Sequence, residues 1–445
     1  MMNAIHTAVE KYRDLILQAE RDLWRMPETG YKEVKTSKYM EDAFRALGYD
    51  LTMAEGITGF YTRLETGRPG PEVLILGELD SIICPDHPDA DPETGAVHSC
   101  GHNAQCAALL GIAAALREPG VLDGLSGSIR LCAVPAEELL EIGYRSRLKE
   151  QGVIKYFGGK CEFLHRGYFD GVDIAFMVHT EKRVAVGRGS NGCLAKNIIY
   201  KGVASHAGGA PYAGKNALYA ATCGLNAINA IRETFIDADR TRVHPIITHG
   251  GDMVNAIPER VVLESYVRGV SFEAITRENS KVNRALCGAA LSIGTNIEIV
   301  DIPGYSPLLN SKEMVELAKD AADYVFKDEP IKVSNRMGGG STDMGDLSCI
   351  MPVVHPYCAG AEGKGHGNDY RIVDPVAACV ENAKWQLVML TLLLRDGAER
   401  AKQVIDAFEP RFASKEEFLA FQDSLNCSGN RIVYREDGVA EVNIR

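Results

Sequence analysis

The chain of 445 residues is long enough for two or three domains, since one domain spans roughly 150 residues. Its composition, 46% hydrophobic and 24% charged, is typical of a globular protein with a full core. The net charge of −12 argues against a nucleic-acid-binding protein, which carries a basic stripe, and against binding to an anionic membrane surface.

The chain opens without a basic region followed by an apolar stretch, so we expect no signal peptide and a cytoplasmic location. In that reducing compartment the twelve cysteines should mostly be free thiols in the core. No CxxC pair is present, which removes zinc-ribbon and thioredoxin-like sites. The apolar run 385–394 is too short to span a bilayer and predicts a buried helix.

The first 180 residues alternate between helical and strand patterns. Residues 5–24 form an amphipathic helical pattern, and residues 104–117 an alanine-rich one. Three apolar segments predict buried strands: 72–79, 128–134 and 173–178. Strands that alternate with helices predict an α/β domain with a mainly parallel sheet.

The pattern changes near residue 190. Strands are predicted at 193–202, 244–249, 259–268 and 294–302, and helices at 215–232 and 272–289. This βαββαβ order predicts a ferredoxin-like α+β domain. The rest returns to helix, with a Gly-rich loop at 338–340, a strand that ends in His355 and a helix at 376–395. We therefore predict one discontinuous α/β domain, residues 1–189 and 304–445, with an inserted domain of residues 190–303.

Polar side chains follow each predicted strand of the first domain. Asp80 ends the first strand, Glu137 and Glu138 follow the second, and His179 follows the third. Ligands of open α/β sheets bind outside the carboxyl ends of the strands. Each residue alone is also explained as a helix cap or a strand terminus, but together they predict a site at this edge.

Cys100 and His102 precede the alanine-rich helix as Cys-Gly-His. Thiolate and imidazole both bind borderline metals such as zinc. Alternate residues of an extended segment face the same way, so both side chains can converge on one ion. The alternative is a buried cysteine beside a capping histidine.

Glu137 and Glu138 are adjacent carboxylates, and adjacent residues of an extended chain point apart. One can bind a metal while the other faces substrate and accepts a proton, the division that metal-assisted hydrolysis requires. The alternative is a solvated helix N-terminus, where glutamate interacts favourably with the helix dipole.

The segment GGGSTDMGD (338–346) lacks the lysine and the spacing of a phosphate-binding P-loop. It predicts instead a substrate-facing loop, in which Gly340 and Ser341 offer backbone N–H groups to an anion. The alternative is a plain flexible turn.

Six segments in this order resemble the aminoacylase/carboxypeptidase family of metallopeptidases, over about residues 10–395. They are HSCGHN (98–103), PAEE (135–138), the strand end at His179, GVASHAGGAPYAGKNAL (202–218), NAIPERVVLESYVR (255–268) and GGGSTDMGD. The chain is most similar to the amidohydrolase branch. Segment 156–179 looks most like the aminobenzoyl-glutamate hydrolase subunits and the aminoacyl dipeptidases.

The resemblance implies a role for each matching residue. It implies that two divalent metal ions, Mn²⁺ or Zn²⁺, are held by Cys100 as the bridging ligand and by His102, Glu138, His179 and His366. His355 is the rival of His366, but it ends a buried strand before a proline, so we interpret it as structural. Glu137 would be the general base, and Asp80 a carboxylate that orients a metal ligand.

The inserted domain would be the lid and dimerisation domain of this family. His206 matches the histidine that reaches an active site, usually across the dimer, and stabilises the oxyanion. Asn255 and Arg268 match groups that hold the carboxylate of the substrate, a task for which the forked guanidinium is suited. The alternative for Arg268 is a surface residue at a strand end.

Three features depart from the family pattern. Asn103 stands where the branch usually has aspartate, which removes a charge beside the metals. Leu-Trp-Arg-Met (23–26) replaces a histidine-rich stretch. Residues 396–445 have no counterpart that we can assign.

We therefore predict a two-metal amidohydrolase that cleaves the amide bond of N-acyl, N-aroyl or aminoacyl amino acids, such as p-aminobenzoyl-glutamate. The alternatives are a dipeptidase on small aminoacyl dipeptides and a non-catalytic dimeric subunit of the same fold. The expected assembly is a homodimer, and the alternative is a complex with a heteromeric partner subunit.

Overall fold

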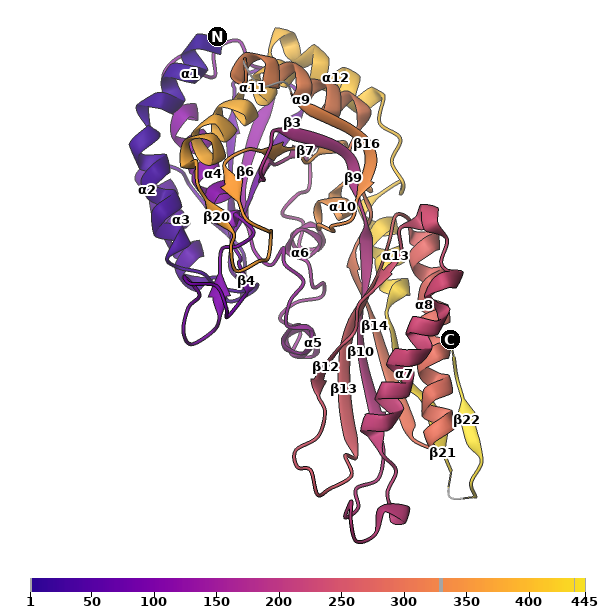
Figure 1. Cartoon of the computed structure of the whole chain (residues 1–445). Helices are drawn as coiled ribbons and strands as arrows, with labels where there is room; N and C mark the ends of the chain where they lie inside the picture. The colour runs from indigo at the N-terminus through magenta and orange to yellow at the C-terminus, as the bar shows by residue number, and fades with distance from the viewer. Residues whose placement is uncertain (1, 328–330, 436, 445) are drawn as a thin grey trace.

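The computed structural model describes residues 2–327, 331–435 and 437–444. Figure 1 shows two parts: a compact one, built on a six-stranded sheet, and an elongated one, built on a seven-stranded sheet. The combination of helices and sheets gives the α/β character that we predicted.

The six-stranded sheet has the order β1-β2-β6-β3-β7-β17. The central pairings, β6 with β3, β3 with β7 and β7 with β17, are parallel, whereas β1 and β2 add antiparallel pairings at one edge. Every residue of β3 and β6 is buried, which explains why both strands are nearly continuous apolar runs in the sequence. The strands are β1 (Thr52–Met53), β2 (Phe60–Glu65), β3 (Glu72–Glu78), β6 (Ser128–Val134), β7 (Ile174–Phe176) and β17 (Val353–Val354).

Helices cover this sheet. Those of the first part are α1 (Met2–Lys11), α2 (Arg13–Trp24), α3 (Val34–Ala46), α4 (His102–Leu116), α5 (Ile142–Glu150), α6 (Gly159–His165), α9 (Lys312–Val325), α10 (Met344–Leu347), α11 (Asn382–Leu394) and α12 (Glu399–Asp406). The predicted single helix 5–24 is wrong: α1 and α2 are separate, and the chain departs from helical geometry at Tyr12.

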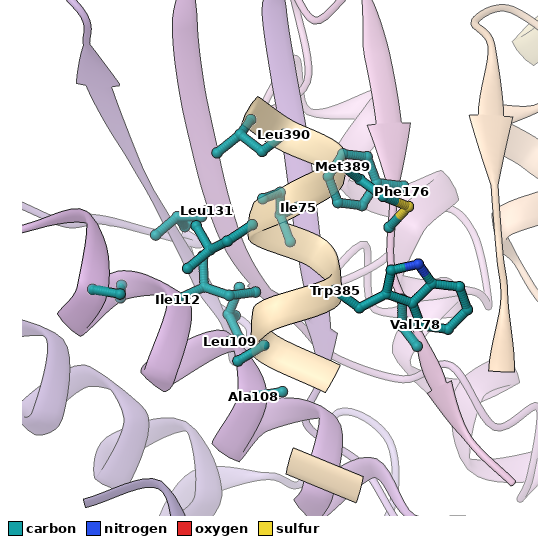
Figure 2. Close-up of a cluster of buried hydrophobic side chains, with 14 of the residues drawn as sticks. Ile75, Ala108, Leu109, Ile112, Leu131, Phe176, Val178, Trp385, Met389 and Leu390 are labelled. Carbon is teal, nitrogen blue, oxygen red and sulfur yellow. The ribbon is translucent and has the colours of Figure 1, made fainter. Parts of the chain in front are cut away.

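The main core lies between the six-stranded sheet and helices α4 and α11. Figure 2 shows side chains of β3, β6 and β7 beside those of α4 and α11, with Phe176 and Trp385 among them. The Trp385 indole N–H donates to the carbonyl of Ala318 at 2.8 Å, so its one polar atom is satisfied in the core.

The helical stretch Val376–Leu394 is long and apolar enough to cross a membrane by length and composition. The apolar run 385–394, for which we predicted a buried helix, lies within this stretch, whose first six residues form a π-helical turn (Val376–Glu381) ahead of α11. Of the most apolar window, 83% is buried inside the protein, which is typical of the core helix of a globular domain.

The seven-stranded sheet is antiparallel throughout, with the order β11-β13-β10-β14-β21-β22 and β12 paired to β13. Its strands are β10 (Gly192–Lys201), β11 (Arg242–Val243), β12 (Ile246–His249), β13 (Arg260–Gly269), β14 (Asn296–Tyr305), β21 (Cys427–Tyr434) and β22 (Ala440–Val442). The chain order of β10, α7, β12, β13, α8 and β14 follows the predicted βαββαβ pattern.

Two long helices, α7 (Ala217–Ile231) and α8 (Phe272–Ile293), pack together on one face of this sheet (Figure 1). Side-chain caps define where they begin: Asn216 accepts from the N–H of Tyr219, and Ser271 from that of Ala274. Gly294, with φ of +73°, ends α8 in the left-handed conformation that glycine favours.

The chain terminus joins both parts of the molecule. Helix α13 (Lys415–Leu425) packs against α6, and β21 then pairs with β14. Our predicted division placed 304–445 wholly with the first domain. Residues 427–442 depart from it, because β21 and β22 extend the second sheet beyond β14. The division at 189/190 and 303/304 otherwise stays a prediction.

Short elements complete the structure. A five-stranded sheet holds β8 (His179–Thr180), β9 (Ala185–Ser190), β15 (Leu308–Leu309), β16 (Lys332–Gly338) and β18 (Tyr357–Cys358). Two hairpins pair β4 (Ile82–Ile83) with β5 (Ala96–Val97) and β19 (Ala361–Glu362) with β20 (Arg371–Ile372). Single 3₁₀ turns lie at Pro211–Ala213, Arg232–Thr234, Asp237–Asp239 and Asp396–Ala398.

Candidate metal centre and active site

The carboxyl ends of the central strands carry the predicted site residues. Asp80 follows β3, Glu137 and Glu138 follow β6, and β8 begins at His179, close behind β7. These positions meet at one edge because β6, β3 and β7 run parallel.

Gly101 turns the chain between Cys100 and His102. Its φ of +85° lies in the left-handed region, and a Cβ on it would clash with the hydroxyl of Tyr370. Glycine is therefore required here, and it places Cys100 before the first turn of α4 and His102 in it.

Among the residues that the structure describes, three groups of side chains bring their ligand atoms within 4.8 Å of one another: Cys100, His102 and His179; Cys100, Glu138 and His366; and Glu78, His102 and Glu137. Cys100 belongs to two groups, and its Sγ lies 3.4 Å from Nε2 of His179. A side chain shared by two adjacent groups has the position that a bridging ligand requires.

Asp80 holds two of these residues in place. Its Oδ1 lies 3.2 Å from Nδ1 of His102, whose other partner is the backbone carbonyl of Asp80 at 2.9 Å. Its Oδ2 accepts from the N–H of Glu138 at 2.7 Å. Because Nδ1 is engaged in this way, Nε2 of His102 is the ring nitrogen left to face the site.

His366 and His355 both lie at the site. Nε2 of His366 is 3.0 Å from Oε1 of Glu138. His355 is buried, its two ring nitrogens have no hydrogen-bond partner among the described residues, and its ring lies 5.8 Å from that of His179. Burial and the neighbouring His179 lower the pKa of His355 to about 3, so its ring is neutral. His355 thus lines the site rather than the core alone.

The pKa values of Glu137 and Cys100 are shifted in opposite directions. Burial, together with the carboxylates of Glu78 and Glu138, raises the pKa of Glu137 well above its usual value. Burial raises the pKa of the Cys100 thiol, but His102 and His179 outweigh it and lower the pKa to about 6. Cys100 is therefore poised to bind as a thiolate, and Glu137 to hold a proton.

A buried lysine, which the sequence did not reveal, binds two carboxylates beside the site. Nζ of Lys160 lies 2.5 Å from Oε1 of Glu78 and 2.5 Å from Oδ1 of Asp343, and all three side chains are buried. Oε2 of Glu78 lies 3.3 Å from Nε2 of His102. Lys160 thereby connects Glu78, which lies beside His102, to Asp343 of the GGGSTDMGD segment.

The GGGSTDMGD segment has two different halves. Asp343 and Asp346 are buried, and Asp346 accepts from the N–H of Ser306 at 2.9 Å. Gly340 and Ser341 instead line the cavity above the site. The interpretation as a plain flexible turn is wrong for the second half, because Asp343 anchors the segment to α6 and Asp346 anchors it to Ser306, the residue after β14.

The backbone beside the glutamates is strained. Ala136 and Glu141, on either side of Glu137 and Glu138, have φ of +59° and +51°, which are uncommon for residues other than glycine. The N–H of Ala136 donates to Oε1 of the buried Glu33 at 2.8 Å, an interaction that holds this conformation. Such strain concentrates at functional sites.

A cavity of about 430 Å³ opens above these residues. Its walls include side chains from both parts of the molecule: Cys100, Glu137, Glu138, His179, His355 and His366 from the first, and Tyr266 and Arg268 from β13. The hydroxyls of Tyr266 and Tyr305 donate to the backbone carbonyls of Leu139 and Glu137, respectively, which ties the second sheet to the glutamates.

His206 and Asn255 lie elsewhere. The carbonyl of Asn255 accepts from the N–H of Ala207, so the two predicted residues are neighbours, in the loops that follow β10 and β12. These loops form the end of the second part farthest from the first sheet (Figure 1). Neither residue lines the cavity. The structure of the single chain thus does not bring them to the predicted site.

The residues present fit metal ions. Their donor atoms are one thiolate, three imidazoles and carboxylates, a set that suits zinc or manganese. Nε2 of His102 and Oε2 of Glu78 are buried and have no hydrogen-bond partner among the described residues. These two atoms lie 3.3 Å apart, and a cation bound beside them would satisfy both.

Fold and donor set together define an α/β protein with a candidate metal centre at the strand ends. The profile of peptidase family M20/M25/M40 matches residues 74–385. The chain therefore belongs to this family of hydrolases, which confirms the family predicted from the motifs.

Curated relatives are hydrolases and peptidases of low identity. "Uncharacterized hydrolase y4tI" of Sinorhizobium fredii is 25% identical over 83% of this chain and 90% of its own. The human Xaa-Arg dipeptidase is 28% identical over 79% and 78%. One of the two p-aminobenzoyl-glutamate hydrolase subunits of Escherichia coli is 25% identical over 67% and 76%.

Solved structures share the fold. A putative aminohydrolase from Staphylococcus aureus superposes with a TM-score of 0.69 at 20% identity and covers 89% of this chain and 100% of its own. A Bacillus subtilis protein described as a dinuclear metal binding peptidase gives 0.61 at 19%, over 88% and 99%. At these identities the likeness concerns the fold alone.

Proposed function

We propose that this protein is a two-metal amidohydrolase that cleaves the amide bond of N-acyl, N-aroyl or aminoacyl amino acids. The observation that carries the proposal is the convergence of Cys100, His102, Glu138, His179 and His366 beside Glu137 at the base of one cavity. These five side chains would hold the ions. When bound, two divalent ions would polarise the amide carbonyl and lower the pKa of a water molecule.

Glu137 is the group of this chain that moves the proton. Its carboxylate accepts a proton from the attacking water and returns it to the amide nitrogen, so that the C–N bond breaks and an amine leaves. The raised pKa of Glu137, caused by burial and by neighbouring carboxylates, favours the protonated form that the second step needs.

The forked guanidinium of Arg268 in the cavity wall holds the α-carboxylate of the amino acid. Gly340 and Ser341 line the same cavity and offer backbone N–H groups to the substrate. p-Aminobenzoyl-glutamate, the substrate class named for the E. coli relative, and small aminoacyl dipeptides, as for the human relative, are both candidates.

The second part of the chain serves as lid and dimerisation domain in this proposal. His206 and Asn255 are exposed and remote from the cavity of their own chain, which a second copy explains if its loops reach across. The E. coli hydrolase is built from two different subunits, and both are similar to this chain, so a heteromeric partner is the alternative. The cytoplasmic location stays a prediction.

The test is a hydrolysis screen. Purified protein is supplied with Mn²⁺ or Zn²⁺ and with N-acyl amino acids and dipeptides, and the released amine is measured. Glu137→Ala should lower kcat by about 10²- to 10⁴-fold while the bound metal is retained. If no amine is released from any substrate, the proposal is contradicted and a non-catalytic protein is favoured. Unchanged turnover by Glu137→Ala would contradict the mechanism.

A further inference from the structure

A second cavity, of about 480 Å³, continues from the catalytic one. The two share Leu140, Tyr266 and Arg268 in their walls. The second cavity is further lined by Arg242 and His244, which come from the short strand β11 and the residues after it. A substrate held at Arg268 therefore has room to extend toward β11.

Arg242 and Arg268 are directly opposite one another in the sheet. They are Cα partners in the antiparallel pairing of β11 with β13, so their side chains leave the same face. Directly opposite Cα atoms lie about 4.5 to 5.5 Å apart, and like charges at such positions are destabilising. Two guanidiniums in this arrangement favour an anion between them.

No carboxylate of the described residues neutralises the pair. Among the residues that the structure describes, neither guanidinium forms an ion pair; Arg242 donates to the carbonyl of Thr241, and Arg268 lies over the ring of Tyr266. Two acidic residues do line the cavity, but Glu141 is bound by Lys32 at 2.6 Å. Glu264 lies four residues before Arg268 on β13, about 13 Å along the strand.

We propose that Arg242 and Arg268 form a two-guanidinium subsite that selects substrates whose leaving amino acid is acidic. Arg268, which lines both cavities, takes the α-carboxylate. Arg242 lines only the second cavity and is more exposed than Arg268, and it takes the side-chain carboxylate. The substrate class is then the N-acyl or N-aroyl derivative of glutamate or aspartate, rather than of a neutral or basic amino acid. This inference rests on the proposed amidohydrolase function.

The experiment compares N-acetyl-glutamate with N-acetyl-glutamine, which differ only in the charge of the side chain. The wild-type protein should favour the glutamate derivative in kcat/KM by roughly 10- to 100-fold, the range expected for a charged hydrogen bond. Arg242→Gln should bring the ratio of the two kcat/KM values close to one, and Arg242→Lys should restore part of it. Arg260→Gln, an exposed arginine at the other end of β13, is the matched control and should keep the wild-type ratio.

An unchanged ratio in Arg242→Gln, or an equal loss on both substrates, would overturn the proposal. Binding separates it from a failure of the proposed function. Glutarate is a dicarboxylate that is not hydrolysed, and its binding is measured by calorimetric titration. Its dissociation constant should be at least roughly 10-fold higher for Arg242→Gln than for the wild type. If the wild type hydrolyses no acyl amino acid but glutarate binding depends on Arg242, the function fails and the subsite stands. No binding of glutarate to the wild type overturns the subsite.

Discussion

The strand ends of the first part and the distal loops of the second part hold their candidate residues in opposite ways. At the strand ends Asp80 and Glu78 are buried, as is Lys160 of α6, and each has a partner within hydrogen-bond distance. In the distal loops His206 is exposed, and near it Tyr212 is 89% exposed and Val254 fully so.

This difference shows which side-chain arrangements a single chain fixes without a partner. Buried, paired charges keep one arrangement, because any departure leaves an uncompensated charge in the interior. Exposed loops with large apolar side chains need an external surface to define their arrangement, and such side chains mark interaction sites. The first region should therefore be sensitive to substitution in stability, and the second in activity and assembly.

The largest effect is expected at the buried lysine. Lys160→Met leaves the carboxylates of Glu78 and Asp343 buried without a cation, and the free energy of unfolding should fall by about 3 to 5 kcal/mol. Urea denaturation measures it. Lys155→Met is the matched control, since its ion pair with Asp423 is exposed and should cost less than about 1 kcal/mol. Equal losses in the two variants would contradict the claim that burial makes the charge pairs of Lys160 decisive for stability.

A loss of activity without a loss of stability is expected at the distal loop. His206→Ala should lower kcat by about 10²- to 10³-fold, the typical loss for one oxyanion donor, and change the free energy of unfolding by less than about 0.5 kcal/mol. Steady-state kinetics and urea denaturation measure the two effects.

Mixing shows whether His206 acts across a dimer. His206→Ala and Glu137→Ala, each nearly inactive, are unfolded together at equal amounts and refolded. Hybrid dimers would carry one complete site, so activity should recover to about a quarter of that of the wild type. Absence of recovery would place His206 in its own chain's site or outside any site.

A smaller, pH-dependent effect is expected at Asp346. Burial raises the pKa of this carboxyl to about 7 in the folded protein, above its usual value of 3.8. Between pH 4 and 7 the folded state therefore holds a proton that the unfolded state has lost, so the contribution of Asp346 to stability falls as pH rises. The slope is at most about 1.4 kcal/mol per pH unit.

Asp346→Asn removes this titration and keeps an oxygen that can accept from the N–H of Ser306. Relative to the wild type, its free energy of unfolding should rise between pH 5 and pH 6.5, as measured by urea denaturation at both values. The exposed Asp406→Asn should show no such trend. Parallel pH profiles of Asp346→Asn and the wild type would contradict a buried, protonated Asp346.

Most of the elements near the candidate metal centre followed from sequence pattern. The strand 128–134 was predicted with the bounds of β6, and 72–79 differs from β3 by one residue, because strands buried on both faces are continuous apolar runs bounded by polar residues. The break at Tyr12 and the pairing of β21 with β14 were missed. Neither glycine nor proline marks the former, and the latter joins segments more than a hundred residues apart.

The sequence by itself determined the family and the residues that converge at the strand ends, because Glu137, Glu138 and His179 follow predicted strands and Cys100 and His102 stand at the start of a predicted helix. The register of parallel strands then leaves their side chains one place to meet. Only the tertiary structure paired Lys160 with Glu78 and Asp343, set Arg242 opposite Arg268, and left His206 outside the cavity. These relations depend on packing between distant segments, which no local pattern of polar and apolar residues encodes.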